Sequence, residues 1–362
     1  MFCKYHWYKD AGMHKLSLFL ITLLWVFSVH IRAQLPENLI KQGLSLDSAG
    51  KYKEAIAVFG KVIEMEPKLP VAWYNRGVSR LHAKQYSLAV VDFNKCIFMD
   101  TGIIEAYFNR FLAYKFTQNY QFALSDISHY IKRFPEDKVA RAQRFLLAEE
   151  MEEWSMAISD KKWQLQHDFD FVKNESRNQN QLLSSLYLKA GSFDSALYFI
   201  NKAISAQPDN WTLLYERAGI LQKMAEYQKS NDDINRILLN EAIPEPATAE
   251  LKHLKADNFF FLKDYTNAKG LYIDLLQRDS TDASVMADYG HCLLQLEKYT
   301  EADIILTRAI KMKNDAPAYA YLGRGLARLK TGRGGEACID WEKSYKLGEK
   351  SAKKYLEYYC KP

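Results

Sequence analysis

The sequence predicts an all-α fold, an α-solenoid of about nine helix-turn-helix units that ends in a capping helix. Small residues recur every 34 positions, at Ala55, Ala89, Ala123 and Ala157. Between them, apolar residues follow the spacing of three and four positions that is typical of a helix, and a short polar break divides each interval in two. Each interval therefore predicts a pair of helices, and consecutive pairs would stack as a solenoid.

The same interval continues in the second half of the chain. It separates Ala196 from Ser230 and Ala268 from Ala302, and Ala337 continues the series one position late. With the units of the first half, this spacing leads us to expect nine units.

The stretch from Pro70 to Thr101 shows how one unit is built. Two antiparallel helices can approach closely only where one of them contributes little bulk, and an aromatic residue four positions later can fill the groove beside it. Proline at the end of several units predicts a turn, because its ring cannot continue a helix. The two helical patterns consist of Trp73, Gly77 and Arg80, then Tyr86, Ala89, Phe93 and Cys96, and the closing prolines are Pro67, Pro135 and Pro208.

A repeat of 34 residues with this arrangement resembles the tetratricopeptide repeat (TPR) family, and the resemblance covers Pro36 to about Gly348. The resemblance is specific for the fold and implies a solenoid of stacked helix pairs. It says little about function, because fold and function are separable.

The segment 1–33 has the features of a secretory signal peptide. Basic residues precede an apolar run of 14 residues, and the segment 31–33 offers small or tolerated residues at a cleavage site before Gln34. The run is short for a membrane span, which needs about 20 residues. We therefore expect an exported protein, periplasmic or associated with the cell envelope. Membrane contact is expected only if this segment is retained as an anchor.

The charge balance excludes an obvious nucleic-acid-binding role. The chain has 49 Lys and Arg residues against 44 Asp and Glu residues, but four of the basic residues and one acidic residue lie within positions 1–33. The mature chain is therefore close to neutral, and it has no long basic run of the kind that binds nucleic acid.

The units fall into two groups along the chain. Units one to four occupy residues 34–172, and units five to nine with the capping helix occupy residues 173–362. The polar stretch 172–181 exceeds the repeat period, so we expect a bend there. A second insertion, 242–246, has two prolines and predicts a stiff loop. Residues 349–360 form the expected capping helix, which keeps the last core from solvent.

The cysteines divide into two kinds. Cys96 and Cys292 fall at core positions and are expected to be packing residues. Cys338 and Cys360 would lie opposite each other if the last two helices are antiparallel, so a disulfide between them is expected in an oxidising compartment. The alternative is two unpaired cysteines. Paired cysteines in this segment also resemble the terminal unit of exported bacterial TPR proteins.

No pattern in the sequence predicts catalysis. Metal-binding, nucleophile and phosphate-binding motifs are missing, and the pair Gly323 and Gly325 lacks the strand and third glycine of a dinucleotide site. His167 with Asp168 and Asp170 is more typical of solvent-exposed polar groups than of a metal site. We therefore expect no enzyme, no catalytic residue, no metal, no cofactor and no small-molecule substrate.

The concave surface is the remaining candidate site. The resemblance implies that the first helix of each unit lines an inner groove, and positions two, five, six, nine and twelve of a unit share one face of that helix. Peptide-binding TPR domains often carry asparagine at position six, where an amide can both donate to and accept from a peptide backbone. The expected peptide contacts are Tyr74, Asn75, Val78, Phe108, Asn109, Leu112 and Gln143.

Three alternatives qualify this expectation. Domains that clamp a C-terminal carboxylate have lysine at position five and asparagine at position nine, whereas this chain has Tyr74 with Val78 and Phe108 with Leu112. A carboxylate clamp is therefore not expected. Tyr74 and Phe108 could instead pack against a neighbouring unit, and the asparagines could be exposed polar residues.

The sequence thus predicts a scaffold that binds a protein or peptide segment in the groove of units one to four. The alternative is an architectural component that docks onto a cell-envelope complex through its convex face or its ends.

Overall fold

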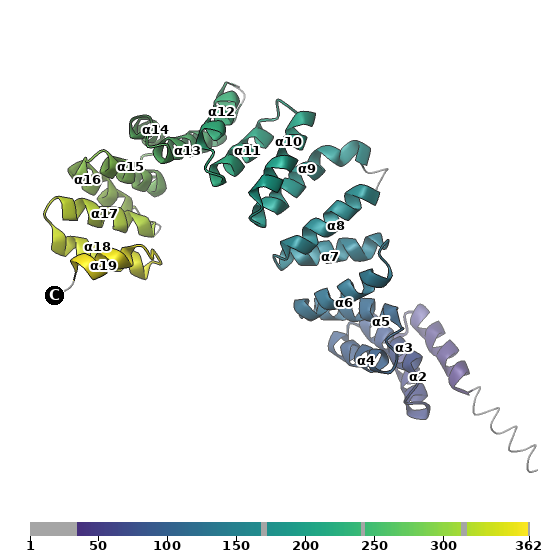
Figure 1. Cartoon of the computed structure of the whole chain (residues 1–362). Helices are drawn as coiled ribbons and strands as arrows, with labels where there is room; N and C mark the ends of the chain where they lie inside the picture. Colours follow the sequence, from purple (N-terminus) through teal and green to yellow (C-terminus); the bar gives the residue numbers. More distant parts are fainter. Residues whose placement is uncertain (1–34, 168–171, 240–242, 313–316, 361–362) are drawn as a thin grey trace, which may run out of the picture. The chain divides into compact units, whose positions relative to one another are not determined.

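The structure is a computed structural model that describes residues 35–167, 172–239, 243–312 and 317–360 (Figure 1). Within these ranges every regular element is an α-helix. The chain divides into two compact halves, Met1–Gln164 and Leu165–Pro362, which we call the N-terminal and C-terminal halves. The predicted signal peptide lies outside the described residues. Among the described residues, no helix combines the length and apolar character that crossing a membrane requires.

The N-terminal half consists of helix pairs. A helix over residues 35–48 comes first. The others are α2 (Tyr52–Met65), α3 (Pro70–His82), α4 (Tyr86–Met99), α5 (Ile104–Phe116), α6 (Tyr120–Arg133), α7 (Lys138–Glu150) and α8 (Trp154–His167), whose last residues lie beyond the division. Consecutive helices from α2 to α7 pack against each other, and Arg144 of α7 is hydrogen-bonded to Asp160 of α8.

The C-terminal half repeats this arrangement, and it confirms the predicted all-α solenoid of helix pairs. Its helices are α9 (Val172–Lys189), α10 (Phe193–Ala206), α11 (Trp211–Lys223), α12 (Tyr227–Leu238), α13 (Glu245–Phe261), α14 (Tyr265–Arg278), α15 (Ala283–Gln295), α16 (Tyr299–Lys311), α17 (Ala318–Lys330), α18 (Gly334–Lys346) and α19 (Ala352–Tyr359).

The two insertions differ from expectation because both lengthen a helix. Residues 172–181 form the first part of α9, which has 18 residues, and α13 has 17 residues. Pro246 lies in the first turn of α13 and Pro244 is its N-cap. Proline is tolerated there because the first amides of a helix have no partner inside it. The predicted boundary at 172/173 stays a prediction.

Small and large residues pair between the two helices of a unit. A Cβ atom on Gly77 would lie 2.7 Å from the Phe93 ring, and one on Gly43 would lie 2.6 Å from the Phe59 ring. The same close approach joins Gly325 to Trp341. In these three units the facing ring occupies the space of the missing side chain, so glycine on the first helix permits the close approach. The alanines that recur in the sequence, such as Ala55 and Ala89, are fully buried on the second helices.

A buried ion pair also joins the two helices of five units. Each pair has an arginine on the first helix and an aspartate on the second, always at the same separation in the sequence, and the aspartates are at most 6% exposed. Two guanidinium N–H groups donate to the two carboxylate oxygens in each pair, a geometry that fixes orientation as well as distance. The pairs are Arg76–Asp92, Arg110–Asp126, Arg144–Asp160, Arg217–Asp233 and Arg324–Asp340.

The turn between the helices of a unit uses a left-handed residue. Lys84 has φ 59° and Gln118 has φ 58°, and both are exposed. The Gln85 amide donates to the Arg80 carbonyl across the first of these turns, at 2.8 Å. Glycine occupies the equivalent place at Gly50 and Gly191. Elsewhere a residue with a side chain accepts this conformation, so the turn has no constant glycine signal in the sequence.

The C-terminal end is closed by α19. Cys338 and Cys360 are joined by a disulfide, with their Cα atoms 5.7 Å apart. Trp341 is fully buried and stacks on Tyr355 of α19, with ring centroids 5.1 Å apart. The bridge and the ring stacking therefore hold α19 over the last repeat core.

The remaining described cysteines are both buried and unpaired. Burial raises the pKa of Cys96 and of Cys292 to about 11. At neutral pH both are therefore thiols, which are poor nucleophiles.

The packing of Gly77 gives a testable prediction. Gly77→Ala should lower the free energy of unfolding by about 1 to 3 kcal/mol, because the new methyl group would overlap the Phe93 ring in a filled core. Gly60→Ala on α2 is the matched control. Its Cβ would meet nothing closer than 4.0 Å, so it should stabilise the chain by about 0.5 to 1 kcal/mol through helix propensity. Urea unfolding of both variants measures this, and equal effects would contradict the packing argument.

Candidate binding groove

The first helices of neighbouring units contact one another directly. These contacts join α3 to α5 in the N-terminal half, and α11 to α13, α13 to α15 and α15 to α17 in the C-terminal half. We use groove positions for the second, fifth, sixth, ninth and twelfth residues of a unit, which share one face of its first helix. Units two to four are counted from residues 70, 104 and 138, and units five to nine from residues 177, 211, 249, 283 and 318.

Hydrogen bonds between units already engage three of the predicted peptide contacts. The Asn109 amide donates to the Tyr74 hydroxyl at 3.1 Å, and the Gln143 carbonyl oxygen accepts from Lys115 at 3.0 Å. Asn75 is only 9% exposed. A bound peptide would therefore have to share or replace these hydrogen bonds.

The apolar members of the predicted set contribute to the repeat cores. Tyr74 and Val78 pack against the buried cluster around Phe93, and Phe108 and Leu112 pack against the cluster around Phe111. The alternative that the sequence left open for the two aromatic residues is packing against a neighbouring unit, and both clusters also include residues of the next unit, such as Ala106 and Ala140. Because all four side chains are only partly buried, a role in binding stays a prediction.

The contact between Tyr74 and Asn109 belongs to a recurring pattern. It joins position five of one unit to position six of the next. In the C-terminal half, the Gln181 amide donates to Glu216 at 2.5 Å, and His253 Nε2 lies 2.9 Å from the Asp288 carboxylate. Each pair has the same separation in the sequence, so side chains along the groove link consecutive units.

A hollow of about 600 Å³ opens on the groove side of α9, α11 and α13. Its walls are mainly apolar. The lining consists of Gln181, Leu182, Ser184, Ser185 and Leu188 from α9, Tyr215, Glu216, Gly219 and Ile220 from α11, and Leu254 from α13. All of them except Ser184 and Ile220 occupy groove positions, although none belongs to the units in which the sequence predicted the site.

Glu216 is the acidic group of this hollow. It is partly buried, and burial raises its pKa above the ordinary value, whereas the hydrogen bond from Gln181 lowers it. Among residues 35–167, 179–239, 243–312 and 317–360, no lysine, arginine or histidine forms an ion pair with Glu216. The neighbouring Tyr215 hydroxyl donates to Glu250 of α13 at 3.3 Å.

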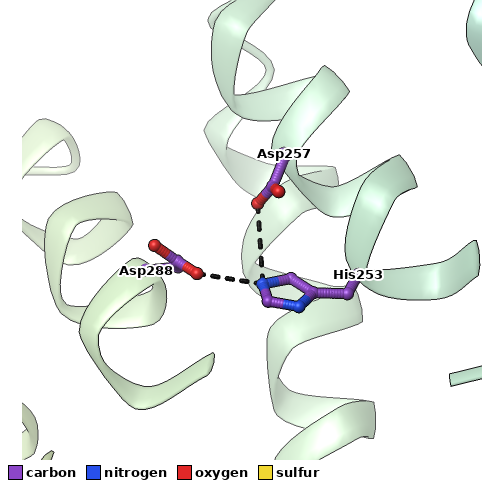
Figure 2. A group of neighbouring side chains, drawn as sticks. All are labelled: His253, Asp257 and Asp288. Atoms are coloured by element: carbon purple, nitrogen blue, oxygen red, sulfur yellow. Dashed lines mark hydrogen bonds and ion pairs between the residues drawn. The ribbon is translucent and has the colours of Figure 1, made fainter. Parts of the chain in front are cut away.

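A second hollow, of about 250 Å³, lies beside a group of titratable side chains on α13 and α15 (Figure 2). His253 and Asp257 lie one turn apart on α13, and their side chains and Asp288 point toward one another. His253 Nε2 lies 3.8 Å from Asp257 Oδ1 and 2.9 Å from Asp288 Oδ2. The hydroxyls of Tyr272 and Tyr319 donate to Asp257 and Asp288 at 2.7 Å and 2.9 Å.

Charge holds this group together. Burial alone would lower the pKa of His253, but the hydrogen bond to Asp288 and the charges of both aspartates raise it above the ordinary value. Burial raises the pKa of Asp257. The donor atoms of the three residues lie within 4.8 Å of one another, so they could hold a metal ion. A protonated histidine between two carboxylates explains the same proximity without one.

Two signals in the sequence could have found this group. His253 and Asp257 are four positions apart on a predicted helix and so share a face. Asp288 lies at position six of the next unit, where the recurring pattern places a partner for His253. The metal candidate considered in the sequence, His167 with two aspartates, has Asp168 and Asp170 outside the described residues.

Comparisons with known proteins agree with this architecture. Models of the tetratricopeptide repeat match residues 40–95, 180–210 and 262–329. None of the curated proteins compared with the chain matches it.

Solved structures with similar helical arrays share little sequence with the chain. The structure of Naa15/Naa10 bound to HypK-THB has a TM-score of 0.52 at 11% identity, covering 89% of this chain and 66% of that one. A tetratricopeptide repeat protein from Parabacteroides merdae has a TM-score of 0.36 at 19% identity, covering 72% and 99%. YrrB, described as a TPR protein with an unusual peptide-binding site, has a TM-score of 0.41 at 14% identity, covering 52% and 97%.

The His253 group predicts a pH effect. Because its folded pKa is raised, the protonated histidine stabilises the fold fully below the pKa of an unfolded histidine, and this contribution is lost as pH rises through the folded pKa. Asp288→Asn should lower the pKa of His253, as followed by NMR titration of the imidazole protons. Asp274→Asn, which removes a carboxylate bound to Lys252, should leave that pKa unchanged. An unchanged His253 pKa in Asp288→Asn would contradict the assigned cause.

Proposed function

Because the chain belongs to the tetratricopeptide repeat family, we propose that it binds a segment of another protein in the groove lined by the first helices of its units. The observation that carries the proposal is the hollow on α9, α11 and α13. Its volume of about 600 Å³ lies within the range of known ligand pockets, and its lining combines apolar walls with a few polar groups. The proposal assigns no catalytic role to the chain.

The form of the groove suits an extended or helical segment. Leu182, Leu188 and Leu254 offer contacts for apolar side chains, while Gln181 and Ser185 offer hydrogen bonds. A groove of this kind on a helical surface is one of the recurring ways in which proteins recognise peptides. The proposed site therefore lies in the C-terminal half, whereas the sequence predicted it in units one to four. The predicted peptide contacts of the N-terminal half are a second region to test.

Export to the periplasm or cell envelope forms part of the same proposal. The segment 1–33 has the composition of a signal peptide, and the disulfide between Cys338 and Cys360 suits an oxidising compartment.

One observation favours the architectural alternative. Phe98 on α4 and Phe122 on α6 are 87% and 62% exposed, and both lie on the second helices of their units. Large exposed aromatic residues are typical of surfaces that dock onto other proteins. A partner held there would not depend on the groove.

Blocking the hollow tests the groove. A Cβ on Gly219 would meet nothing within 4 Å, so Gly219→Phe should fill the hollow without disturbing the fold. We expect at least a tenfold loss of partner capture by the mature chain in envelope extracts, equivalent to about 1.4 kcal/mol or more. Gly270→Phe on α14 is the matched control, because that position is equally open but lies on a second helix.

Three results would redirect or reject the proposal. Loss of capture only in Tyr74→Ala with Asn109→Ala would place the segment in the N-terminal half. Loss only in Phe98→Ser with Phe122→Ser would favour docking through the second helices. Equal capture by Gly219→Phe and wild type would reject the hollow as the binding site. Thermal melts of each variant establish that the fold is retained.

A further inference from the structure

We infer that the hollow on α9, α11 and α13 binds a lysine or arginine side chain of the captured segment, with the Glu216 carboxylate as its receptor. The inference rests on the proposed function, because it specifies the chemistry of the segment that the groove would hold.

The first support is the contrast between two acidic residues of one unit. Asp233 is buried, and it is neutralised by two hydrogen bonds from Arg217, one of them 2.7 Å long. Glu216 precedes Arg217 in α11 and faces the hollow instead. Its carboxylate accepts a hydrogen bond from the neutral Gln181 amide.

This arrangement leaves a charge only partly compensated. A carboxylate taken out of water loses hydration, and an amide restores less of that loss than a cation does. The raised pKa of Glu216 is the expected sign of this cost. A cation brought by a ligand would offset it.

The walls of the hollow fit the rest of a basic side chain. Leu182, Leu188 and Leu254 are apolar, and Tyr215 adds an aromatic ring. Lysine and arginine carry three or four methylene groups before the charge, and these groups pack well on apolar surfaces. The hollow thus offers apolar walls for the methylene groups and the Glu216 carboxylate for the charged end of a basic side chain.

The wider groove has the same electrostatic character. From unit five to unit nine, the groove positions include no lysine or arginine, whereas four of them are acidic. These are Glu216, Glu250, Asp257 and Asp288. His253 accompanies the last two, while Glu250 accepts a hydrogen bond from the Tyr215 hydroxyl. A segment with basic residues would therefore meet complementary charge along α11 to α15.

The test uses a random dodecapeptide library displayed on phage and selected against the mature chain. Peptides whose binding is lost in Gly219→Phe are kept, since these bind in the hollow. We expect lysine or arginine to be enriched in them beside apolar residues. One such peptide, synthesised with a fluorophore, should bind Glu216→Gln about tenfold more weakly than wild type by fluorescence anisotropy.

A double-mutant cycle assigns the contact. Replacing the peptide's basic residue by norleucine should also lower its affinity for the wild-type chain about tenfold. In Glu216→Gln the same replacement should change the affinity little, because the interaction is already absent. Glu342→Gln on α18 removes one exposed charge outside the groove and should leave affinity unchanged. Glu216→Gln keeps the size of the side chain, and its thermal melt checks the fold.

The outcomes separate the two proposals. Hollow-binding peptides without basic enrichment, or with equal affinity for Glu216→Gln, would overturn the inference and leave the proposed function standing. Failure to obtain any peptide sensitive to Gly219→Phe would overturn both.

Discussion

Close contact between the two helices of each unit sets the geometry of the groove. Gly77 admits the Phe93 ring, and Gly325 admits the Trp341 ring, so the two backbones approach until one side chain fills the space of the other. The bidentate pair of Arg76 with Asp92 then fixes the rotation of one helix about the other. In the units that have these contacts, distance and rotation are set, and the groove positions of the first helix then face the groove within each half.

Much of this fold could be predicted because close helix contact leaves a periodic trace. Alanine recurs at a fixed interval where bulk is excluded, and proline marks several unit ends. The periodic pattern does not hold in units where the large residue lies on the other helix of the pair. Unit three places Phe111 on the first helix and Ile127 on the second, both fully buried, so the large residue has changed sides. Polar composition was also a poor guide at 172–181, where the chain continues as helix rather than interrupting it.

The candidate site was less predictable than the fold for a physical reason. Recurrent amides at Asn75 and Asn109 indicated the first units, but a sequence does not show that Asn109 is bonded to Tyr74 across the unit boundary. The hollow exists because Gly219 leaves space among residues of α9 and α13 that are distant in the sequence. The groove positions, which can be counted from the sequence, include most of the lining residues. Packing between neighbouring units decides which of them leave space at those positions. That packing is seen in the structure and not in the sequence.

Site-specific photocrosslinking in the cells that produce the protein would show where a partner segment lies. Benzoylphenylalanine would be placed at residue 219 on α11 or at residue 270 on α14. Both sites are open, so the probe is tolerated equally. A segment held in the hollow of the C-terminal half would crosslink from residue 219 and not from residue 270. Crosslinks from residue 270 with none from residue 219 would contradict binding in the hollow.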